Sequence, residues 1–185
     1  MNEEKRNLVV EWKIRFNEII KGRQAKPQER RKRMFDKELI VMSDQKFQNK
    51  KEVISYLAEL KNGCVGDPAG YREDVFAREN AIATYVGFDT AIPHAKSAFV
   101  NEPFVLYARL PESIEWGDDG ETVSQVFLLG VPKDANGENA RLHLQIIAAL
   151  TKRLMHESFR RTLNEAGTKE EIYQLFTNLE KEIML

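Results

Sequence analysis

Apolar and polar positions follow two kinds of pattern along this chain, and the first predicts β-strands. Residues 104–110 alternate in the way that is typical of a strand. Residues 123–131 are apolar almost throughout, as in a strand that is covered on both faces. The shorter run 39–42 suggests another buried segment. The stretch 82–96 contains glycine, threonine and proline at positions 87, 90 and 93, which favours strand and loop over helix.

The second pattern repeats every three to four residues and predicts amphipathic helices. Such helices are predicted for residues 49–63, 71–78, 142–154, 158–163 and 168–179, with a polar loop at 132–139. Two of them begin with a capping box, in which a polar side chain at the helix start and an acidic side chain three residues later cap the first turn. The pairs are Asn49 with Glu52 and Thr168 with Glu171, and Gly63 is placed to end the first helix.

Helices and strands in this order predict an α/β (α+β) fold, a mixed β-sheet flanked by helices. Residues 1–33 differ from the rest and predict an N-terminal helical extension or linker, with the main domain at 34–185. Apolar residues recur on one helical face at Val9, Trp12, Phe16 and Ile19. The basic run at 21–33 suits contact with nucleic acid or anionic lipid, or a solvated face. It has no interleaved aromatic residues to stack bases, which favours the solvated face.

Composition narrows the class of protein. Of the 185 residues, 42% are apolar and 31% are charged, which is typical of a soluble globular protein. The formal net charge of -1 predicts no strong attraction to nucleic acid or to an anionic membrane. A single cysteine, Cys64, forms no internal disulfide, and it is most simply a small buried apolar residue. With no apolar run long enough to span a bilayer and no signal peptide at the start, we expect a cytoplasmic protein without direct membrane insertion.

The candidate chemistry centres on histidine, because its neutral side chain is nucleophilic near physiological pH. His94 follows Pro93, which restricts the backbone and holds the imidazole at the end of a strand. Lys96 and Ser97 come next and supply a cation and a hydroxyl that suit a phosphoryl group. A partly buried histidine that binds a loop carbonyl is the simpler interpretation of these local features.

The remaining polar candidates each have a plain structural alternative. His143 lies on the inward face of the predicted helix 142–154, where it is either a core-edge residue or a second imidazole that faces His94. His156 lies between two helices and suits a cap or a solvent-facing role. Arg78 can bind phosphate in bidentate fashion, or form an ordinary surface ion pair with Glu79. The segment 117–120 is a turn rather than a phosphate loop, since it lacks the lysine and the following helix.

Taken together, these motifs resemble a known family. Arg78-Glu-Asn, Thr84-Tyr-Val-Gly87 and Ala91-Ile-Pro-His94 resemble the signature of fructose/mannitol-type enzyme IIA domains of the bacterial phosphoenolpyruvate:sugar phosphotransferase system. The resemblance runs from about Met34 to the C-terminus and includes Leu142-His-Leu144. The sequence Gly87-Phe-Asp-Thr departs from the more usual glycine-rich approach to this core.

The resemblance implies a function and assigns residues to it. His94 matches the histidine that is phosphorylated, His143 a supporting histidine, and Arg78 an arginine near the site. It implies the histidine-containing carrier protein HPr as donor and a IIB component, beside a membrane IIC unit, as acceptor. We expect no metal or other cofactor, because the phosphoryl group arrives already activated on nitrogen. Two alternatives stay open: a regulatory relative whose His94 phosphorylation controls protein contacts, and a binding module in which His94 is structural.

Overall fold

The computed structural model describes residues 33–60, 63–117, 119–134 and 137–183. The strands are β1 (Ile40–Met42), β2 (Tyr85–Gly87), β3 (Thr90–Ala91), β4 (His94–Ser97), β5 (Phe104–Glu115) and β6 (Thr122–Pro132). The helices are η1 (Lys37–Leu39), α2 (Lys50–Glu59), α3 (Pro68–Ala81), α4 (Glu138–Leu154), α5 (Glu157–Glu165) and α6 (Lys169–Ile183). The predicted N-terminal helix lies outside the described residues, so the division of the chain at residue 33 stays a prediction.

One mixed sheet organises the described part of the chain, with the strand order β1-β5-β6-β3-β2. The two long strands, β5 and β6, are antiparallel and form its centre, while β1 joins β5 in parallel. The free side of β6 pairs in parallel first with β3 and then with β4. This edge is where the chain around the predicted nucleophile lies.

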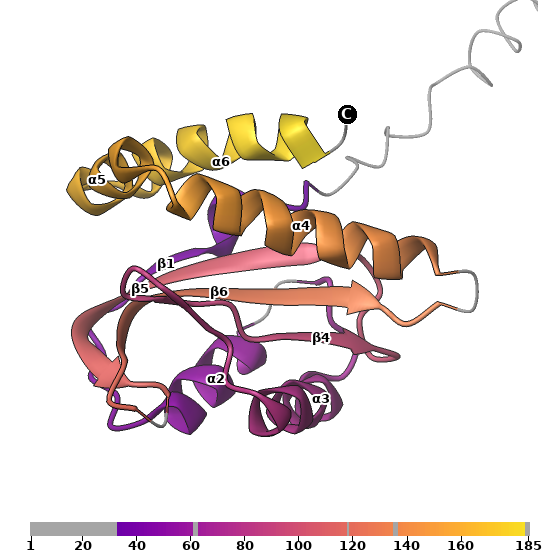
Figure 1. The fold of residues 1–185 in the computed structure, drawn as a ribbon. Helices are drawn as coiled ribbons and strands as arrows, with labels where there is room; N and C mark the ends of the chain where they lie inside the picture. Colours follow the sequence, from indigo (N-terminus) through magenta and orange to yellow (C-terminus); the bar gives the residue numbers. More distant parts are fainter. Residues whose placement is uncertain (1–32, 61–62, 118, 135–136, 184–185) are drawn as a thin grey trace, which may run out of the picture. The chain divides into compact units, whose positions relative to one another are not determined.

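Helices cover both faces of the sheet, as predicted. Helices α4, α5 and α6 lie on one face, and α2 and α3 lie on the other (Figure 1). Each face buries its own apolar cluster, one built around Ile54, Tyr71 and Trp116 and the other around Phe127, Leu150 and Phe176. Residues of β6 point alternately into the two clusters, which explains why its sequence is apolar almost throughout. The prediction of a mixed sheet flanked by helices is confirmed.

The predicted capping box at Thr168 and Glu171 is complete, whereas at Asn49 the acidic side chain binds the amide one residue before the cap. The Asn49 side chain accepts from the Glu52 amide at 3.1 Å, and a Glu52 carboxylate oxygen accepts from the Gln48 amide at 2.9 Å. At the start of α6, the Thr168 hydroxyl accepts from the Glu171 amide at 3.3 Å, and the Glu171 carboxylate accepts from the Thr168 amide at 3.0 Å. These bonds satisfy amides that have no partner inside the helix.

Several element boundaries differ from the prediction. Helix α2 ends at Glu59, four residues before Gly63, because Leu60 already has extended backbone angles. Helix α3 begins at Pro68, earlier than predicted, because the Asp67 side chain accepts from the Ala69 amide and proline is compatible with the first helical position. Helix α4 also starts inside the predicted polar loop, at Glu138.

Strand β5 runs to Glu115, beyond the predicted end at residue 110. The prediction rested on the alternating pattern, which covers residues 104–110, and Pro111, which follows it, cannot donate to a strand partner. In the structure the register of β5 against β6 shifts between Arg109 and Ile114, so Pro111 lies where the regular ladder is interrupted. The strand then resumes with Ile114 opposite Val123.

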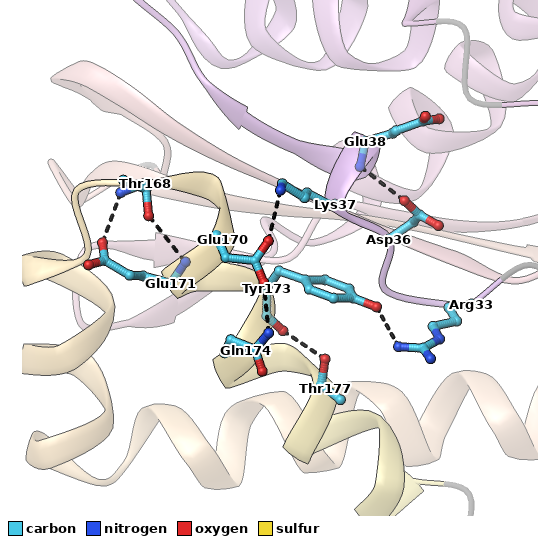
Figure 2. Close-up of polar contacts among 10 residues, drawn as sticks. All are labelled: Arg33, Asp36, Lys37, Glu38, Thr168, Glu170, Glu171, Tyr173, Gln174 and Thr177. Atoms are coloured by element: carbon cyan, nitrogen blue, oxygen red, sulfur yellow. Dashed lines mark hydrogen bonds and ion pairs between the residues drawn. The ribbon is translucent and has the colours of Figure 1, made fainter.

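The first described residues are bound to α6, far away in the sequence (Figure 2). The Arg33 guanidinium donates to the Tyr173 hydroxyl, and Lys37 pairs with Glu170 at 2.7 Å. The Met34 amide also donates to Glu180 at 2.8 Å. These contacts make the segment before β1 part of the domain. In the described part of the chain, no helix is long and apolar enough to cross a membrane.

Close packing against β6 makes Gly130 a sensitive position. A Cβ atom at Gly130 would lie 2.3 Å from a ring carbon of Phe104, which is fully buried. We therefore expect Gly130→Ala to lower the free energy of unfolding by about 1–3 kcal/mol, measured by urea denaturation. A Phe104→Leu change in the same chain should make the two effects less than additive, because the smaller side chain relieves the clash. Additive effects would show that the cost of the added methyl group does not come from its clash with the Phe104 ring.

Candidate functional site

His94 begins β4, immediately after the break that separates β3 from β4. β3 pairs with β6 as far as Ala91 opposite Val126, and β4 continues from His94 opposite Leu129. Between them, the Ile92 amide donates to the Thr84 carbonyl at 3.0 Å, and the Pro93 carbonyl accepts from the Leu129 amide at 2.9 Å. Proline has no amide proton to leave unpaired in this break. The backbone that carries His94 is thus held from both sides.

The ring of His94 has a defined tautomer. Its Nδ1 lies 2.7 Å from the Ile92 carbonyl oxygen, which can only accept, so Nδ1 carries the proton and donates. The lone pair of the neutral ring is therefore on Nε2. Burial lowers the pKa of His94 from 6.5, and the nearby Arg78 charge adds to this, while the bond to Ile92 and the charge of Glu79 oppose it. At neutral pH the imidazole is therefore uncharged.

A second imidazole faces the first. His143 projects from α4, and its ring centroid lies 4.8 Å from that of His94. Both side chains are 8% exposed. Burial, followed by the charges of His94, Lys96 and Arg78, lowers the pKa of His143 to about 4. Its Nε2 is buried and has no hydrogen-bond partner among the described residues.

The two histidines line a cavity of about 630 Å³ between α3, the β2–β4 segment and α4. Arg78 and Lys96 line it as well, so two basic side chains share the cavity with the imidazoles. The Arg78 guanidinium donates to the Ile82 carbonyl at 2.9 Å, which ties it to the end of α3. The alternative for Arg78, a surface ion pair with Glu79, is absent from the described contacts, because Glu79 is buried and accepts from Thr84 instead.

The structure brings together four of the five residues that were predicted to form the site, namely His94, His143, Arg78 and Lys96. Ser97 is the exception: it is fully buried, its hydroxyl accepts from the Phe99 amide at 3.1 Å, and it does not line the cavity. In a strand, side chains at successive positions alternate between faces, so Ser97 and Lys96 point in opposite directions. Cys64 is buried, and His156 is exposed at the start of α5 without a side-chain cap bond.

Comparison with known proteins now identifies the group to which this site belongs. Residues 33–179 match the model of the family described as "Phosphoenolpyruvate-dependent sugar phosphotransferase system, EIIA 2". The chain belongs to this family. The resemblance noted in the sequence is therefore confirmed, and the chain contains an EIIA domain of the fructose/mannitol type.

Individual relatives agree with this assignment. The chain is 34% identical over 112 residues to the fructose-like EIIA component of Escherichia coli, covering 60% of this chain and 73% of that protein. It is 35% identical to the fructose-specific EIIA component of Haloferax volcanii, covering 70% and 84%. Multiphosphoryl transfer protein 2 of Escherichia coli is 33% identical over 70% of this chain, but the match spans 15% of that longer protein.

Solved structures of EIIA domains share the fold. The nitrogen regulatory protein IIA-Ntr of Neisseria meningitidis superposes with a TM-score of 0.67 at 28% identity, covering 77% of this chain and 95% of that one. The mannitol IIA of Escherichia coli superposes with a TM-score of 0.63 at 25% identity, covering 76% and 97%.

The turn before the His94 segment, residues 87–89, has an unusual backbone conformation. Gly87, Phe88 and Asp89 all have positive φ angles, of 88°, 55° and 58°. Phenylalanine rarely adopts this region and aspartate does so only occasionally, so other contacts must help to hold them there. The Asp89 carboxylate accepts from the Ser124 hydroxyl, and the guanidinium of Arg160 lies 4.1 Å above the Phe88 ring. The chain thus keeps the turn by side-chain contacts where glycine would permit it directly.

The lowered pKa values predict that this EIIA domain loses stability in acid. A histidine whose pKa is lower in the folded state binds fewer protons there than in the unfolded chain, so its contribution is fully present above pH 6.5 and is lost as the pH falls toward the folded pKa. For His143 this window runs from 6.5 to about 4. We expect a loss on the order of 2 kcal/mol across it, after allowing for solvent contact of the ring.

Urea denaturation at a series of pH values would measure this dependence. His143→Gln should flatten it, because glutamine does not titrate, whereas Gln145→Leu on the exposed side of α4 should leave it unchanged. If the free energy of unfolding depends on pH equally in wild type and in His143→Gln, His143 does not cause the loss of stability in acid.

Proposed function

We propose that Nε2 of His94 accepts a phosphoryl group from phosphorylated HPr and passes it to a IIB component of a sugar phosphotransferase system. The observation that carries this proposal is the Nδ1–H bond to the Ile92 carbonyl at 2.7 Å, which leaves Nε2 as the nucleophilic atom of a ring that lines an open cavity. A histidine held only for structural reasons would not need a second imidazole and two cations around it.

The reaction consists of two in-line transfers. In the first, the lone pair of His94 Nε2 attacks phosphorus as the bond from phosphorus to the donor nitrogen breaks, and the donor imidazole keeps that electron pair. The ring of His94 then carries a positive charge shared with Nδ1–H, which the Ile92 carbonyl stabilises. In the second, the acceptor nucleophile attacks phosphorus, and His94 leaves as a neutral imidazole, an adequate leaving group without further proton transfer.

The cations and His143 suit the charge that spreads over the phosphoryl oxygens during transfer. Arg78 and Lys96 supply fixed positive charge at the cavity. His143 lines the same cavity and has an unmet bonding capacity, because its buried Nε2 has no partner among the described residues. A phosphoryl oxygen on His94 would supply that partner, since the rings are 4.8 Å apart.

The rim of the cavity suits a protein donor and acceptor. Ile82 and Leu144 are 71% and 67% exposed although both are large and apolar, and Leu144 also lines the cavity. Exposed apolar residues beside a reactive group favour docking of another protein surface. A phosphohistidine on HPr and a nucleophile on IIB can each approach such an open site.

The choice of a fructose-type acceptor rests on sequence identity to named relatives. The relatives at 34% and 35% identity are named as fructose-like and fructose-specific components, whereas the regulatory relative IIA-Ntr is 28% identical. We therefore favour a fructose-type IIB acceptor, with transfer in the cytoplasm beside a membrane IIC unit. A regulatory role through phosphorylation-dependent protein contacts is the second candidate.

Reconstitution tests the donor and the acceptor in turn. The chain is incubated with phosphoenolpyruvate, enzyme I and HPr, and intact mass is measured; we expect one added phosphate on the full chain. Purified fructose-type IIB is then added, and loss of phosphate from the chain with gain on IIB supports transport. Labelling by HPr without transfer to IIB would favour the regulatory role, and no labelling would contradict both.

A further inference from the structure

Glu79 is a buried carboxylate that the proposed reaction does not use. It lies near the end of α3, is 3% exposed, and does not line the His94 cavity. Its Oε1 accepts from the Thr84 amide at 3.1 Å and from Trp116 Nε1 at 2.9 Å, and its Oε2 accepts from the Thr84 hydroxyl at 2.5 Å. A buried acidic side chain normally needs such partners, and here two of the three come from one residue.

Thr84, which Glu79 binds, is linked to His94 through a single residue, Ile92. The Thr84 carbonyl accepts from the Ile92 amide at 3.0 Å, and the Ile92 carbonyl accepts from His94 Nδ1 at 2.7 Å. Thr84 precedes the short strand β2, and Ile92 lies in the break between β3 and β4, so neither has a long regular ladder to fix its carbonyl. The position of Ile92 depends on the contact with Thr84 together with the flanking pairs to β6.

We propose that Glu79 is a positioning residue for His94: by clamping Thr84 through both its amide and its hydroxyl, it fixes the Ile92 carbonyl and so the orientation and tautomer of the imidazole. The consequence for phosphoryl transfer rests on the function proposed above. The tautomer and orientation are properties of the folded chain and stand apart from it.

The Glu79 carboxylate also contacts Lys50 and acts on His94 through its charge, and both effects bear on the design of a test. Lys50 Nζ lies 3.6 Å from Glu79 Oε1 and donates to the Trp116 carbonyl at 2.8 Å, so it contacts the same carboxylate without touching Thr84. The charge of Glu79 also acts on His94 through space and raises the pKa of that imidazole, although burial, the largest influence, lowers it. A test must therefore distinguish loss of the clamp from loss of the charge.

Four substitutions make that distinction. Glu79→Ala removes the clamp and the charge. Glu79→Gln keeps an oxygen for the Thr84 amide and Trp116, and its amide group can donate to the Thr84 hydroxyl, so the clamp stays and the charge goes. Glu79→Asp keeps the charge but is one methylene too short to reach all three donors. Lys50→Met is the matched control, because it removes the ion pair to Glu79 and leaves the three hydrogen bonds of that carboxylate in place.

The first readout is nitrogen-15 NMR of the imidazole, which reports the fraction of His94 that is protonated on Nδ1 in the unphosphorylated chain. The second is the rate of labelling by phosphorylated HPr. We expect Glu79→Ala and Glu79→Asp to lose the single Nδ1–H tautomer and to label at least ~10-fold more slowly, because small misplacements of a reacting group are costly. Glu79→Gln and Lys50→Met should keep the wild-type tautomer and stay within about threefold of the wild-type rate.

The comparison of Glu79→Asp with Glu79→Gln decides the matter even if Glu79→Ala does not fold. A wild-type tautomer in folded Glu79→Asp would overturn the proposal. Loss of the tautomer in Glu79→Gln but not in Glu79→Asp would overturn it too, and would assign the effect to charge. If wild-type chain is not labelled by HPr at all, the proposed function fails, while the tautomer measurement still tests the clamp.

Discussion

Replacing His94 with alanine is expected to abolish phosphoryl acceptance while the domain stays folded. The substitution removes Nε2, and the other imidazole at the cavity, His143, is held in α4 with its Nε2 buried. His143 therefore does not take over the transfer. The structural loss is small, since the His94 ring makes one hydrogen bond, to Ile92, worth roughly 1 kcal/mol.

The measurement is intact mass after incubation with phosphoenolpyruvate, enzyme I and HPr. His156→Ala is the matched control, because His156 is exposed at the start of α5 and its side chain makes no cap bond. We expect the control to gain one phosphate as the wild type does, and His94→Ala to gain none. Labelling of His94→Ala at the wild-type rate would place the phosphoryl group elsewhere and remove the basis of the proposed function.

Local signals in the sequence predicted much of the fold. Asn49 and Thr168 bind the backbone a few residues away, so the capping boxes could be recognised from spacing alone. The apolar run of β6 predicted a central strand because burial on both faces demands it. The continuation of β5 beyond residue 110 could not be predicted in this way, because it depends on pairing with β6 across the interrupted part of the ladder that contains Pro111.

Part of the candidate site could also be predicted, because some of its residues are close together in the sequence. His94 and Lys96 are close in sequence, and the motif around them is specific enough to identify the family. Ser97 is next to Lys96, but side chains alternate along β4, so Ser97 points into the interior. There its hydroxyl accepts from the Phe99 amide. The approach of the His143 ring to His94 depends on how α4 packs on the sheet, which spacing alone does not give.

Glu79 shows most plainly what sequence reasoning missed. Beside Arg78 on α3 it reads as half of a surface ion pair, and nothing local predicts that it turns inward to Thr84 and Trp116. Trp116 lies 37 positions away, and its indole N–H needs an acceptor once buried. A buried acid so close to a candidate nucleophile is a signal that appears only when the tertiary contacts are known.

Replacing His143 with leucine is expected to slow phosphoryl transfer about 100-fold without abolishing it, the range typical for losing one donor to a developing oxyanion. The low pKa of about 4 means that His143 is neutral at physiological pH, so it assists through an N–H rather than a charge. His143→Gln retains an N–H donor and should lose less. Gln145→Leu, on the exposed side of α4, is the control and should transfer at the wild-type rate.

The same argument makes the pKa of His143 depend on phosphorylation. Burial and the charges of His94, Lys96 and Arg78 lower it in the free domain. A phosphoryl dianion on His94, whose ring centroid is 4.8 Å away, opposes those charges and should raise the pKa. Proton NMR titration of the imidazole in the free and phosphorylated domains would measure the change. An unchanged titration together with wild-type transfer in His143→Leu would return His143 to a purely structural role, whereas an upward shift with slowed transfer would show that the two imidazoles act as one site.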